Sequence, residues 1–282
     1  MYAVGGGYLR LGPLADRPLE SVQATAYVAA ALAQQGAPVV APRPSTAGRL
    51  VEVVASGVPG VGDVSAMLVD AAPGRVRDLD DLTGPDIERW GQAVGLLHEV
   101  GRRVDRSQLP SWPSVVSAAV AGCGDPAVAE AVESVVERCE NVLGPPDVLV
   151  HGDAQPDNAG WTAAGPVFFD LDDVTASWAV ADLAMAVRDA QPIDALDAPV
   201  TSTTAGQLLL RGYRRHATLD RGHEQALPLV QRLAAALTYA RLSRALRPAP
   251  TREPEPDWLV ALRGRLTQTA ERLRAALLAD LP

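Results

Sequence analysis

Two hydrophobic patterns divide the chain near residue 70. The first seventy residues hold short extended runs whose apolar positions alternate or cluster as in strands. These runs span residues 2–4, 8–11, 50–54 and 66–69. Gly5, Gly6 and Gly7 predict a hairpin turn between the first two runs, because glycine readily adopts the positive φ of a tight turn. One helix is predicted over residues 19–35, where Gly36 and Pro38 follow it.

A helical period takes over from residue 84, after a break at residues 71–74. Ile87, Trp90, Val94 and Leu97 fall on one stripe of the first helix. Further helices are predicted at residues 113–121, 126–142, 177–190, 203–217, 223–246 and 256–279, the last with Leu259, Leu262, Leu266, Leu273 and Leu277 facing one way. The pattern therefore predicts an α+β chain, with a small unit at residues 1–70 and a larger helical unit at residues 71–282.

Composition narrows the class of partner. The chain has 282 residues, is 48% hydrophobic and carries a formal charge of -9, which disfavours nucleic acid or an anionic membrane as a partner. Its N-terminus lacks the basic start and apolar core of a signal peptide, and no apolar run of about 18 residues occurs, so a cytoplasmic location is expected. Cys123 and Cys139 lie 16 residues apart with no nearby histidine. This spacing supports neither a disulfide framework nor a zinc site, so both are expected to be ordinary buried thiols.

All 25 basic residues are arginines, and the sequence contains no lysine. Any step that needs a cation beside a phosphate must therefore use a guanidinium, which differs from an ammonium in geometry. Eight arginines and two acidic residues fall in residues 203–250. This imbalance favours a neutral or anionic substrate over a polycation.

Acidic and amide side chains follow two apolar runs, at residues 147–150 and 166–169. Asp153 and Asn158 come after the first run, and Asp170 ends the second. Phosphoryl transfer needs such a set, because the protein must position an incoming hydroxyl and neutralise charge on the phosphates. Amide and carboxylate oxygens are the ligands that Mg²⁺ prefers. We therefore expect Asp153 to act as the base, and Asn158 and Asp170 to hold the metal.

The same residues resemble the signatures of the aminoglycoside phosphotransferase and choline kinase family. The string His151-Gly152-Asp153, followed by four residues and Asn158, is similar to the family's catalytic motif, and Phe168-Phe169-Asp170 to its metal-binding motif. Further similarities are Leu96-Leu97-His98, the hinge-like residues 68–74, and Asp182-Leu183-Ala184. Together they span residues 2–190.

This resemblance implies a two-lobed, protein-kinase-like fold. Residues 1–70 would form a nucleotide-binding lobe that begins about one strand later than the family does, so either its true start lies upstream or its grip on the nucleotide is poor. Residues 71–282 would form the catalytic and substrate lobe. The implied activity is Mg²⁺-dependent transfer of the terminal phosphoryl group of ATP or GTP to a hydroxyl of a small molecule, by a monomer or homodimer.

The resemblance also implies roles for individual residues. Arg10 would hold the phosphates, the backbone of Asp70 and Ala72 would meet the adenine edge, and His151 and Asp182 would support the catalytic loop. Four positions keep a second interpretation. Arg10 could be a solvated charge, and so could Asp172 and Asp173, which would otherwise contact substrate or support the site. His98 is interpreted as a packed or capping residue in preference to a ligand.

One expected partner is missing from the pattern. The helix over residues 19–35 should carry a glutamate that pairs with Arg10, but Thr25 stands at the matching position and Glu20 lies further upstream. This departure keeps open a nucleotide-binding pseudokinase with little or no turnover. A metal-dependent phosphohydrolase is a weaker alternative, because the four histidines form no adjacent His-Asp pair or helical His-x3-His spacing.

Overall fold

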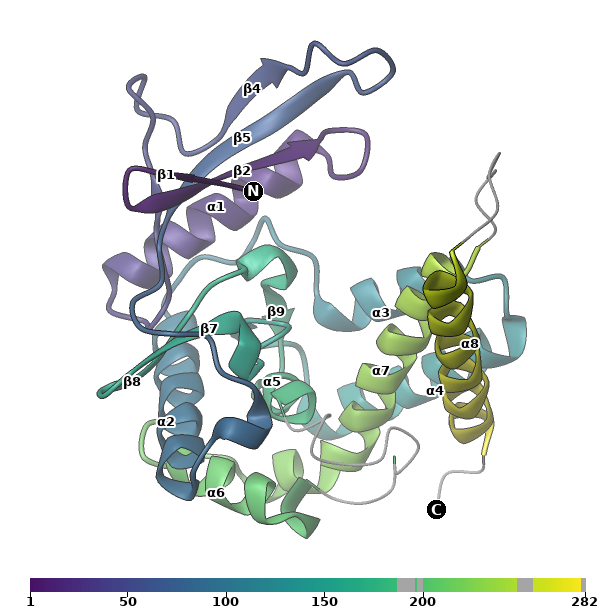
Figure 1. Cartoon of the computed structure of the whole chain (residues 1–282). Helices are drawn as coiled ribbons and strands as arrows, with labels where there is room; N and C mark the ends of the chain where they lie inside the picture. Colours follow the sequence, from purple (N-terminus) through teal and green to yellow (C-terminus); the bar gives the residue numbers. More distant parts are fainter. Residues whose placement is uncertain (187–195, 197–199, 248–255, 280–282) are drawn as a thin grey trace.

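The computed structural model describes residues 1–186, 196, 200–247 and 256–279 (Figure 1). Its N-terminal part is an antiparallel sheet of five strands. The strands are β1 Tyr2–Val4, β2 Gly7–Pro13, β3 Pro42–Arg43, β4 Glu52–Ala55 and β5 Asp63–Asp70. β5 is the hub: β2 pairs with it from Gly7 opposite Asp70 to Pro13 opposite Val64, and β3 and β4 also pair with it.

Helix α1, Leu19–Gln34, lies between this sheet and the rest of the molecule (Figure 1). Val22 and Ala26 pack against Val51 and the partly buried Met67 of the sheet. The opposite side of α1 meets the larger core through Val28, Ala29 and Leu32. Because both sides are apolar, the helix joins two cores and carries its polar residues toward the edges between them.

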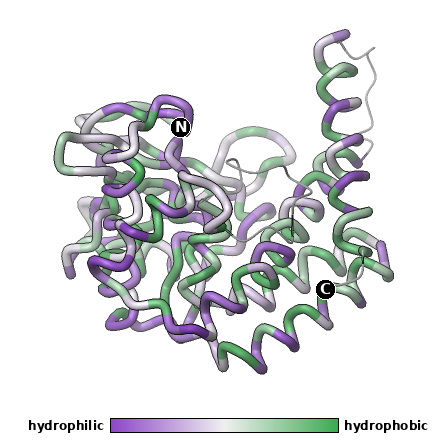
Figure 2. Tube along the Cα trace, turned by 90° about the horizontal axis from the view of Figure 1, so that it is seen from below, coloured by the Kyte–Doolittle hydropathy of each residue, from purple (hydrophilic) through white to green (hydrophobic). Residues whose placement is uncertain are grey.

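The larger part is helical and surrounds two short two-stranded sheets. Its helices are α2 Gly84–Gly101, α3 Trp112–Ala121, α4 Pro126–Leu143, α5 Ala179–Ala186, α6 Thr204–Tyr213, α7 Arg221–Ala245 and α8 Asp257–Leu278. Its strands are β6 Val148–Val150 with β9 Thr175–Ser177, and β7 Ala159–Thr162 with β8 Gly165–Phe168. Figure 2 shows hydrophobic and hydrophilic positions alternating along these helices, as amphipathic packing requires.

Helices α2 and α6 approach each other backbone to backbone. A Cβ on Gly91 would lie 2.0 Å from the carbonyl oxygen of Leu209, and one on Gly212 would lie 1.9 Å from that of Glu88. Only glycine fits at such distances. This close contact fixes α2, whose predicted stripe of Ile87, Trp90, Val94 and Leu97 is buried.

The β7–β8 hairpin is bonded both to the N-terminal part and to the segment that follows it. On β8, Phe168 donates its amide to Pro38 (2.8 Å), and its carbonyl accepts from Val40 (2.8 Å). On β7, Trp161 and Arg75 exchange two backbone hydrogen bonds of 2.8 and 3.2 Å. A Cβ on Gly74, whose φ is +87°, would lie 2.0 Å from the Trp161 carbonyl oxygen, so the connecting segment lies directly on the hairpin.

The predicted fold class and most predicted elements are confirmed, with local differences. Strands β3, β7 and β9 were not predicted, since each has four residues or fewer and carries little periodic signal. The helix predicted over residues 203–217 ends at Tyr213, and α5 accounts for the one predicted over 177–190 as far as Ala186, beyond which that prediction lies outside the described residues. On α8 the predicted stripe is buried at Leu273 and Leu277 but half-buried at its other leucines.

In the described part of the chain, no helix combines the length and hydrophobicity needed to cross a bilayer. Cys123 and Cys139 are both free thiols. Burial raises the pKa of Cys139 to about 12. This thiol therefore stays protonated at neutral pH and contributes to the core as a small apolar group.

Candidate active site

The loop after β6 brings Asp153 and Asn158 into direct contact. The side-chain amide of Asn158 donates to Asp153 Oδ2 (2.9 Å) and to the Asp153 carbonyl (3.0 Å). Gly152 makes the turn possible: its φ is +81°, and a Cβ there would lie 2.3 Å from the carbonyl oxygen of Asp173. The spacing of these residues in the sequence is thus the spacing of one compact turn.

Asp182 holds this loop from beneath. Its side chain is fully buried and accepts from the amides of His151 (2.7 Å) and Gly152 (2.8 Å) and from Nε2 of His98 (2.9 Å). Burial raises the pKa of Asp182, but the hydrogen bonds that it accepts from His98 and from the amide of His151 outweigh this effect and hold the pKa below its usual range. A charged aspartate therefore anchors the catalytic loop to α5.

The two histidines are fixed by what they contact. His98 lies between Asp182 and Tyr213, whose hydroxyl is 3.0 Å from His98 Nδ1. His151 accepts the amide of Asp153 at Nδ1 (3.3 Å), so its Nε2 carries the proton and donates to the Phe169 carbonyl (3.0 Å). His151 thus bonds to the backbone of the loop on both sides, and His98 is packed against two buried polar groups.

Phe169 links the catalytic loop to Asp170. Its amide donates to the Asn158 carbonyl (2.9 Å) and its carbonyl accepts from His151. Asp170 follows with φ +61° and ψ +58°. Among the residues that the structure describes, it is the only one other than glycine with a positive φ. A left-handed residue is an uncommon, strained choice that is found mostly at functional sites. The turn brings the carboxylate of Asp170 within 3.1 Å of Arg10 Nη2.

Arg10 on β2 reaches across from the sheet to this loop. Besides Asp170 it forms an ion pair with Asp172. Asp172 is also held by Arg17, whose Nη1 lies 2.7 Å from Asp172 Oδ1. Asp173, the next residue, pairs instead with Arg241 of α7 at 2.7 Å.

The predicted nucleotide edge lies at the end of β5. Asp70 donates its amide to the Ala41 carbonyl (3.1 Å), and Ala71 donates to the Gly6 carbonyl (3.2 Å). The Asp70 carboxylate pairs with Arg43. Since the Asp70 amide is already engaged, this residue can meet an adenine edge through its carbonyl oxygen, and Ala72 is the residue left to offer an amide.

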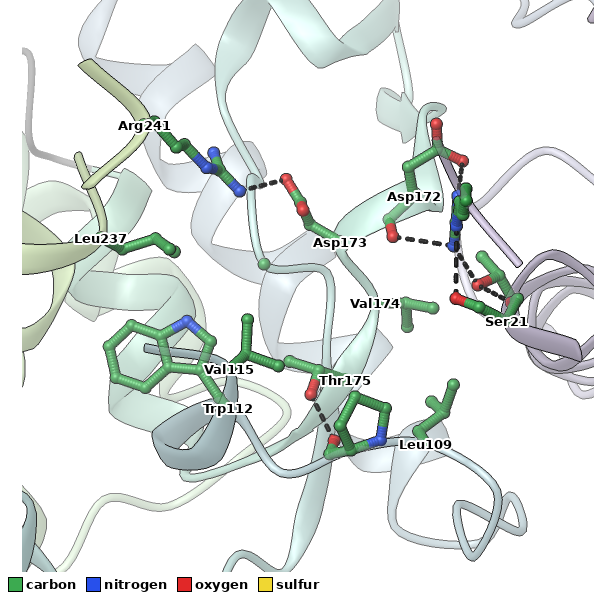
Figure 3. Close-up of a pocket in the computed structure, with 14 residues that line it drawn as sticks. Ser21, Leu109, Trp112, Val115, Asp172, Asp173, Val174, Thr175, Leu237 and Arg241 are labelled. Carbon is green, nitrogen blue, oxygen red and sulfur yellow. Dashed lines mark hydrogen bonds and ion pairs between the residues drawn. The ribbon is translucent and has the colours of Figure 1, made fainter. Parts of the chain in front are cut away.

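A pocket of about 190 Å³ lies beside the catalytic loop, between α1, α3 and α7 (Figure 3). It reaches the loop at Gly152. Its charged rim consists of Arg17, Asp172, Asp173 and Arg241, and Figure 3 shows Arg241 and Asp173 facing each other across one side. Its apolar wall is made by Leu109, Pro110, Trp112, Val115, Val174 and Leu237.

Sequence reasoning missed three residues of this site. Arg17 and Tyr213 lie in segments with no motif, and their partners Asp172 and Asp182 are far away in the sequence. Of the eight arginines in residues 203–250, Arg241 alone is among the described residues that line the pocket. The absence of lysine was the available signal for Arg17, because it makes any arginine near the loop a candidate for charge pairing.

The two lobes and this loop arrangement define a protein-kinase-like phosphotransferase. The phosphotransferase enzyme family model matches residues 2–219. The chain belongs to this family, which confirms the resemblance drawn from the motifs. No curated protein matches its sequence.

Several solved structures share the fold. An amicoumacin kinase in complex with AMP-PNP and Ca²⁺ is 18% identical, with a TM-score of 0.74 over 97% of this chain and 83% of that one. A microcompartment-associated aminopropanol kinase is 18% identical, with a TM-score of 0.62 over 98% and 88%. A spectinomycin phosphotransferase in complex with ADP and spectinomycin is 14% identical, with a TM-score of 0.52 over 97% and 86%.

Proposed function

We propose that this protein transfers the terminal phosphoryl group of ATP, or of GTP, to a hydroxyl group of a small molecule. One observation carries the proposal: Phe169 is bonded through its amide to Asn158 and through its carbonyl to His151, which holds Asp170 against the loop that presents Asp153. These contacts support the expectation that the three groups that phosphoryl transfer requires converge from two loops. Relatives captured with AMP-PNP and ADP support a nucleotide as the donor.

Asp153 is the base in this scheme. The Asn158 amide bonds to its Oδ2 and its carbonyl, so the carboxylate is held in one orientation. It accepts or orients the proton of the incoming hydroxyl, and this positioning is where most of its contribution arises. His151 and Asp182 act through the backbone of the loop and touch no reacting atom.

Asn158 and Asp170 fit a hard cation, because both supply oxygen donors. The described residues contain no group of three or more His, Cys, Asp or Glu side chains that could hold a metal ion. A cation here would complete its shell with phosphate oxygens and water, as Mg²⁺ commonly does in kinases. Bound Mg²⁺ would neutralise charge on the phosphates.

Arg10 and the end of β5 would hold the nucleotide. The guanidinium of Arg10 lies beside Asp170, so it can grip phosphate oxygens next to the metal. The Asp70 carbonyl and the Ala72 amide would meet the base. These roles rest on position within the family pattern together with the contacts of Arg10.

The acceptor would occupy the pocket beside Gly152. Its rim pairs two arginines with two aspartates, so it has no excess of negative charge with which to attract a polycation. Its apolar wall suits a compound with a hydrocarbon part. A neutral or anionic hydroxyl compound is therefore favoured over an aminoglycoside.

A phosphorylation screen read by mass spectrometry tests the function. The protein is incubated with ATP, Mg²⁺ and mixtures of hydroxylated metabolites and antibiotics, and we expect one class to gain the mass of a phosphate group. Asp153→Asn should lower turnover by roughly 10² to 10⁴ with nearly unchanged nucleotide binding. Asp170→Asn should instead weaken binding of the metal–nucleotide.

Asp157→Asn is the matched control, because Asp157 lies in the same loop but is exposed. It should keep turnover within about twofold of the parent. An Asp153→Asn variant with parental turnover would remove this residue from the mechanism. Nucleotide binding without any product across the screen would favour the pseudokinase instead.

A further inference from the structure

The partner of Arg10 is not where the family pattern places it. Helix α1 has a threonine, Thr25, at the position expected to hold a glutamate, and its one acidic residue, Glu20, is exposed at the N-terminal end. Arg10 pairs instead with Asp172, in the turn that follows Asp170. The carboxylate that pairs with Arg10 therefore lies in this loop and not on the helix.

Asp172 is tied back to α1 by Arg17. Nη1 of Arg17 contacts Asp172 Oδ1 (2.7 Å), and Nη2 donates to the Asp172 carbonyl (3.1 Å) and to the hydroxyl of Thr25. Thr25 also donates to the Ser21 carbonyl (2.9 Å), which fixes its hydroxyl as the acceptor for Arg17. The chain of contacts therefore runs from Arg10 through Asp172 and Arg17 to the helix.

Position 25 and Asp172 lie on one small cavity beside Arg10. Arg10, Thr25, Asp170 and Asp172 all line it, together with apolar side chains of α1 and the sheet. A carboxylate at position 25 would therefore enter the same cavity that the Arg10 side chain borders. Thr25 itself is 5% exposed.

We propose that Asp172 is the residue that positions Arg10 for phosphate binding, in place of a carboxylate on α1, with Arg17 fastening Asp172 to the helix. The inference rests on the proposed kinase function. A guanidinium suits this arrangement because its five N–H donors form a rigid fork. Nη2 of Arg10 contacts both Asp172 and Asp170. It can stay on Asp172 while the other nitrogens of the fork turn to a phosphate oxygen.

Arg17 and Asp172 also line the pocket assigned to the acceptor. Asp172 also lines the small cavity that Arg10 borders, so it lies between the acceptor pocket and the group assigned to the nucleotide. If Asp172 served the acceptor alone, its loss would raise the acceptor KM and leave nucleotide affinity unchanged. If it positions Arg10, nucleotide affinity falls even when no acceptor is present.

The test measures the Kd of ATP with Mg²⁺, without acceptor, by calorimetry on the full-length protein. Asp172→Asn should weaken binding about 5- to 20-fold, the range for losing one charge-assisted contact to a phosphate-binding group. Adding Thr25→Glu to Asp172→Asn returns a carboxylate to the shared cavity. The double variant should recover most of the lost affinity.

Glu88→Gln is the matched control, because Glu88 also bridges two arginines, Arg211 and Arg215, on the face between α2 and α6. It should keep the parental Kd within about twofold. The proposal is overturned if Asp172→Asn binds ATP as the parent does, if Glu88→Gln weakens binding equally, or if a folded double variant binds no better than Asp172→Asn.

Circular dichroism establishes whether each variant folds. Should the double variant not fold, the comparison of Asp172→Asn with Glu88→Gln decides the proposal by itself. Failure of the proposed kinase function gives a different result from failure of this inference. If the parent protein binds no nucleotide, the kinase assignment is refuted. If the parent binds ATP and Asp172→Asn binds it equally tightly, only the role of Asp172 is refuted.

Discussion

Asp182 shows how one side chain can determine the geometry of a loop that it does not belong to. Its carboxylate collects two consecutive amides and one imidazole, and none of these donors has water nearby to replace it, because His98 and Asp182 are both fully buried. Removing the acceptor leaves the donors unsatisfied in the core, where each costs far more than a typical hydrogen bond contributes.

We therefore expect Asp182→Ala to lower the free energy of unfolding by about 3–5 kcal/mol, the cost of breaking a buried charged network. Urea denaturation followed by circular dichroism measures the loss. Asp147→Ala serves as control, because Asp147 is exposed and its carboxylate forms a long ion pair of 3.7 Å with Arg102. A loss equal in both variants would show that Asp182 does not anchor the loop.

For single residues, the sequence is informative where the functional groups belong to one local turn. Asp153, Asn158 and Gly152 were recognisable because a single turn imposes their spacing. Arg17 was not, because its interaction with Asp172 spans 155 positions and depends on how α1 meets the loop. The sequence shows that α1 lacks the glutamate expected to pair with Arg10. Only the fold shows that Asp172 pairs with Arg10 instead.

Helix α2 depends on how it begins. Asp86 accepts from the amide of Thr83 (3.0 Å) and from its hydroxyl (2.7 Å), and it pairs with Arg89 (2.6 Å) and Arg77 (3.1 Å). Burial raises the pKa of Asp86, but the hydrogen bonds from Thr83, Arg89 and Arg77 together hold it far below its usual range. The ionised form is therefore part of the folded state.

A carboxyl whose folded pKa is depressed stabilises the fold above its unfolded pKa of about 3.9, and this contribution disappears as the pH falls toward the folded pKa. Asp86→Asn should thus lower the free energy of unfolding by about 1–3 kcal/mol at pH 7. The gap to the parent should persist down to about pH 4 and shrink below it.

Urea midpoints at pH 7, 5 and the lowest pH at which both proteins fold give the comparison. Asp80, which is exposed just before α2, provides the control. Asp80→Asn should change the free energy of unfolding by less than about 0.5 kcal/mol at every pH. A gap that widens on acidification would contradict the role of the ionised Asp86.

Helices were also the elements best predicted, because each of the eight α-helices among the described residues spans at least eight residues and so carries a repeated apolar signal. The short strands β7 and β9 lack that redundancy. Their pairing depends on β8 and β6, which reach them from elsewhere in the chain. Long-range pairing of this kind leaves almost no local trace.

For the whole molecule, nucleotide binding should appear as added thermal stability. A ligand at 100 times its Kd contributes about 2.7 kcal/mol, which for a chain of this size raises Tm by about 5 °C. We expect this shift with ATP and Mg²⁺ in the parent and in Asp157→Asn, and a smaller one in Asp170→Asn. An unchanged Tm at saturating ATP would contradict both the kinase and the pseudokinase interpretations.

The two-lobed architecture could be anticipated because the change from period two to period 3.6 near residue 80 marks a change of structure. How the lobes join could not. Their attachment uses backbone groups of Pro38, Val40 and Arg75, and backbone hydrogen bonds carry no side-chain signature. The glycines at positions 74 and 160 are the trace that this contact leaves in the sequence.

That attachment also decides which parts of the molecule can move. β8 is bonded to residues 38 and 40, and β7 to Arg75 of the connecting segment, so a rotation of the sheet and α1 would take the hairpin as its axis. The C-terminal end of α1 lies next to this axis, and its N-terminal end, with Ser21, borders the pocket. Since α1 is about 24 Å long, a turn of about 10° would carry Ser21 by about 4 Å. Such a turn would also separate Arg17 from Asp172, so the pocket could widen only together with release of Asp172 from the helix.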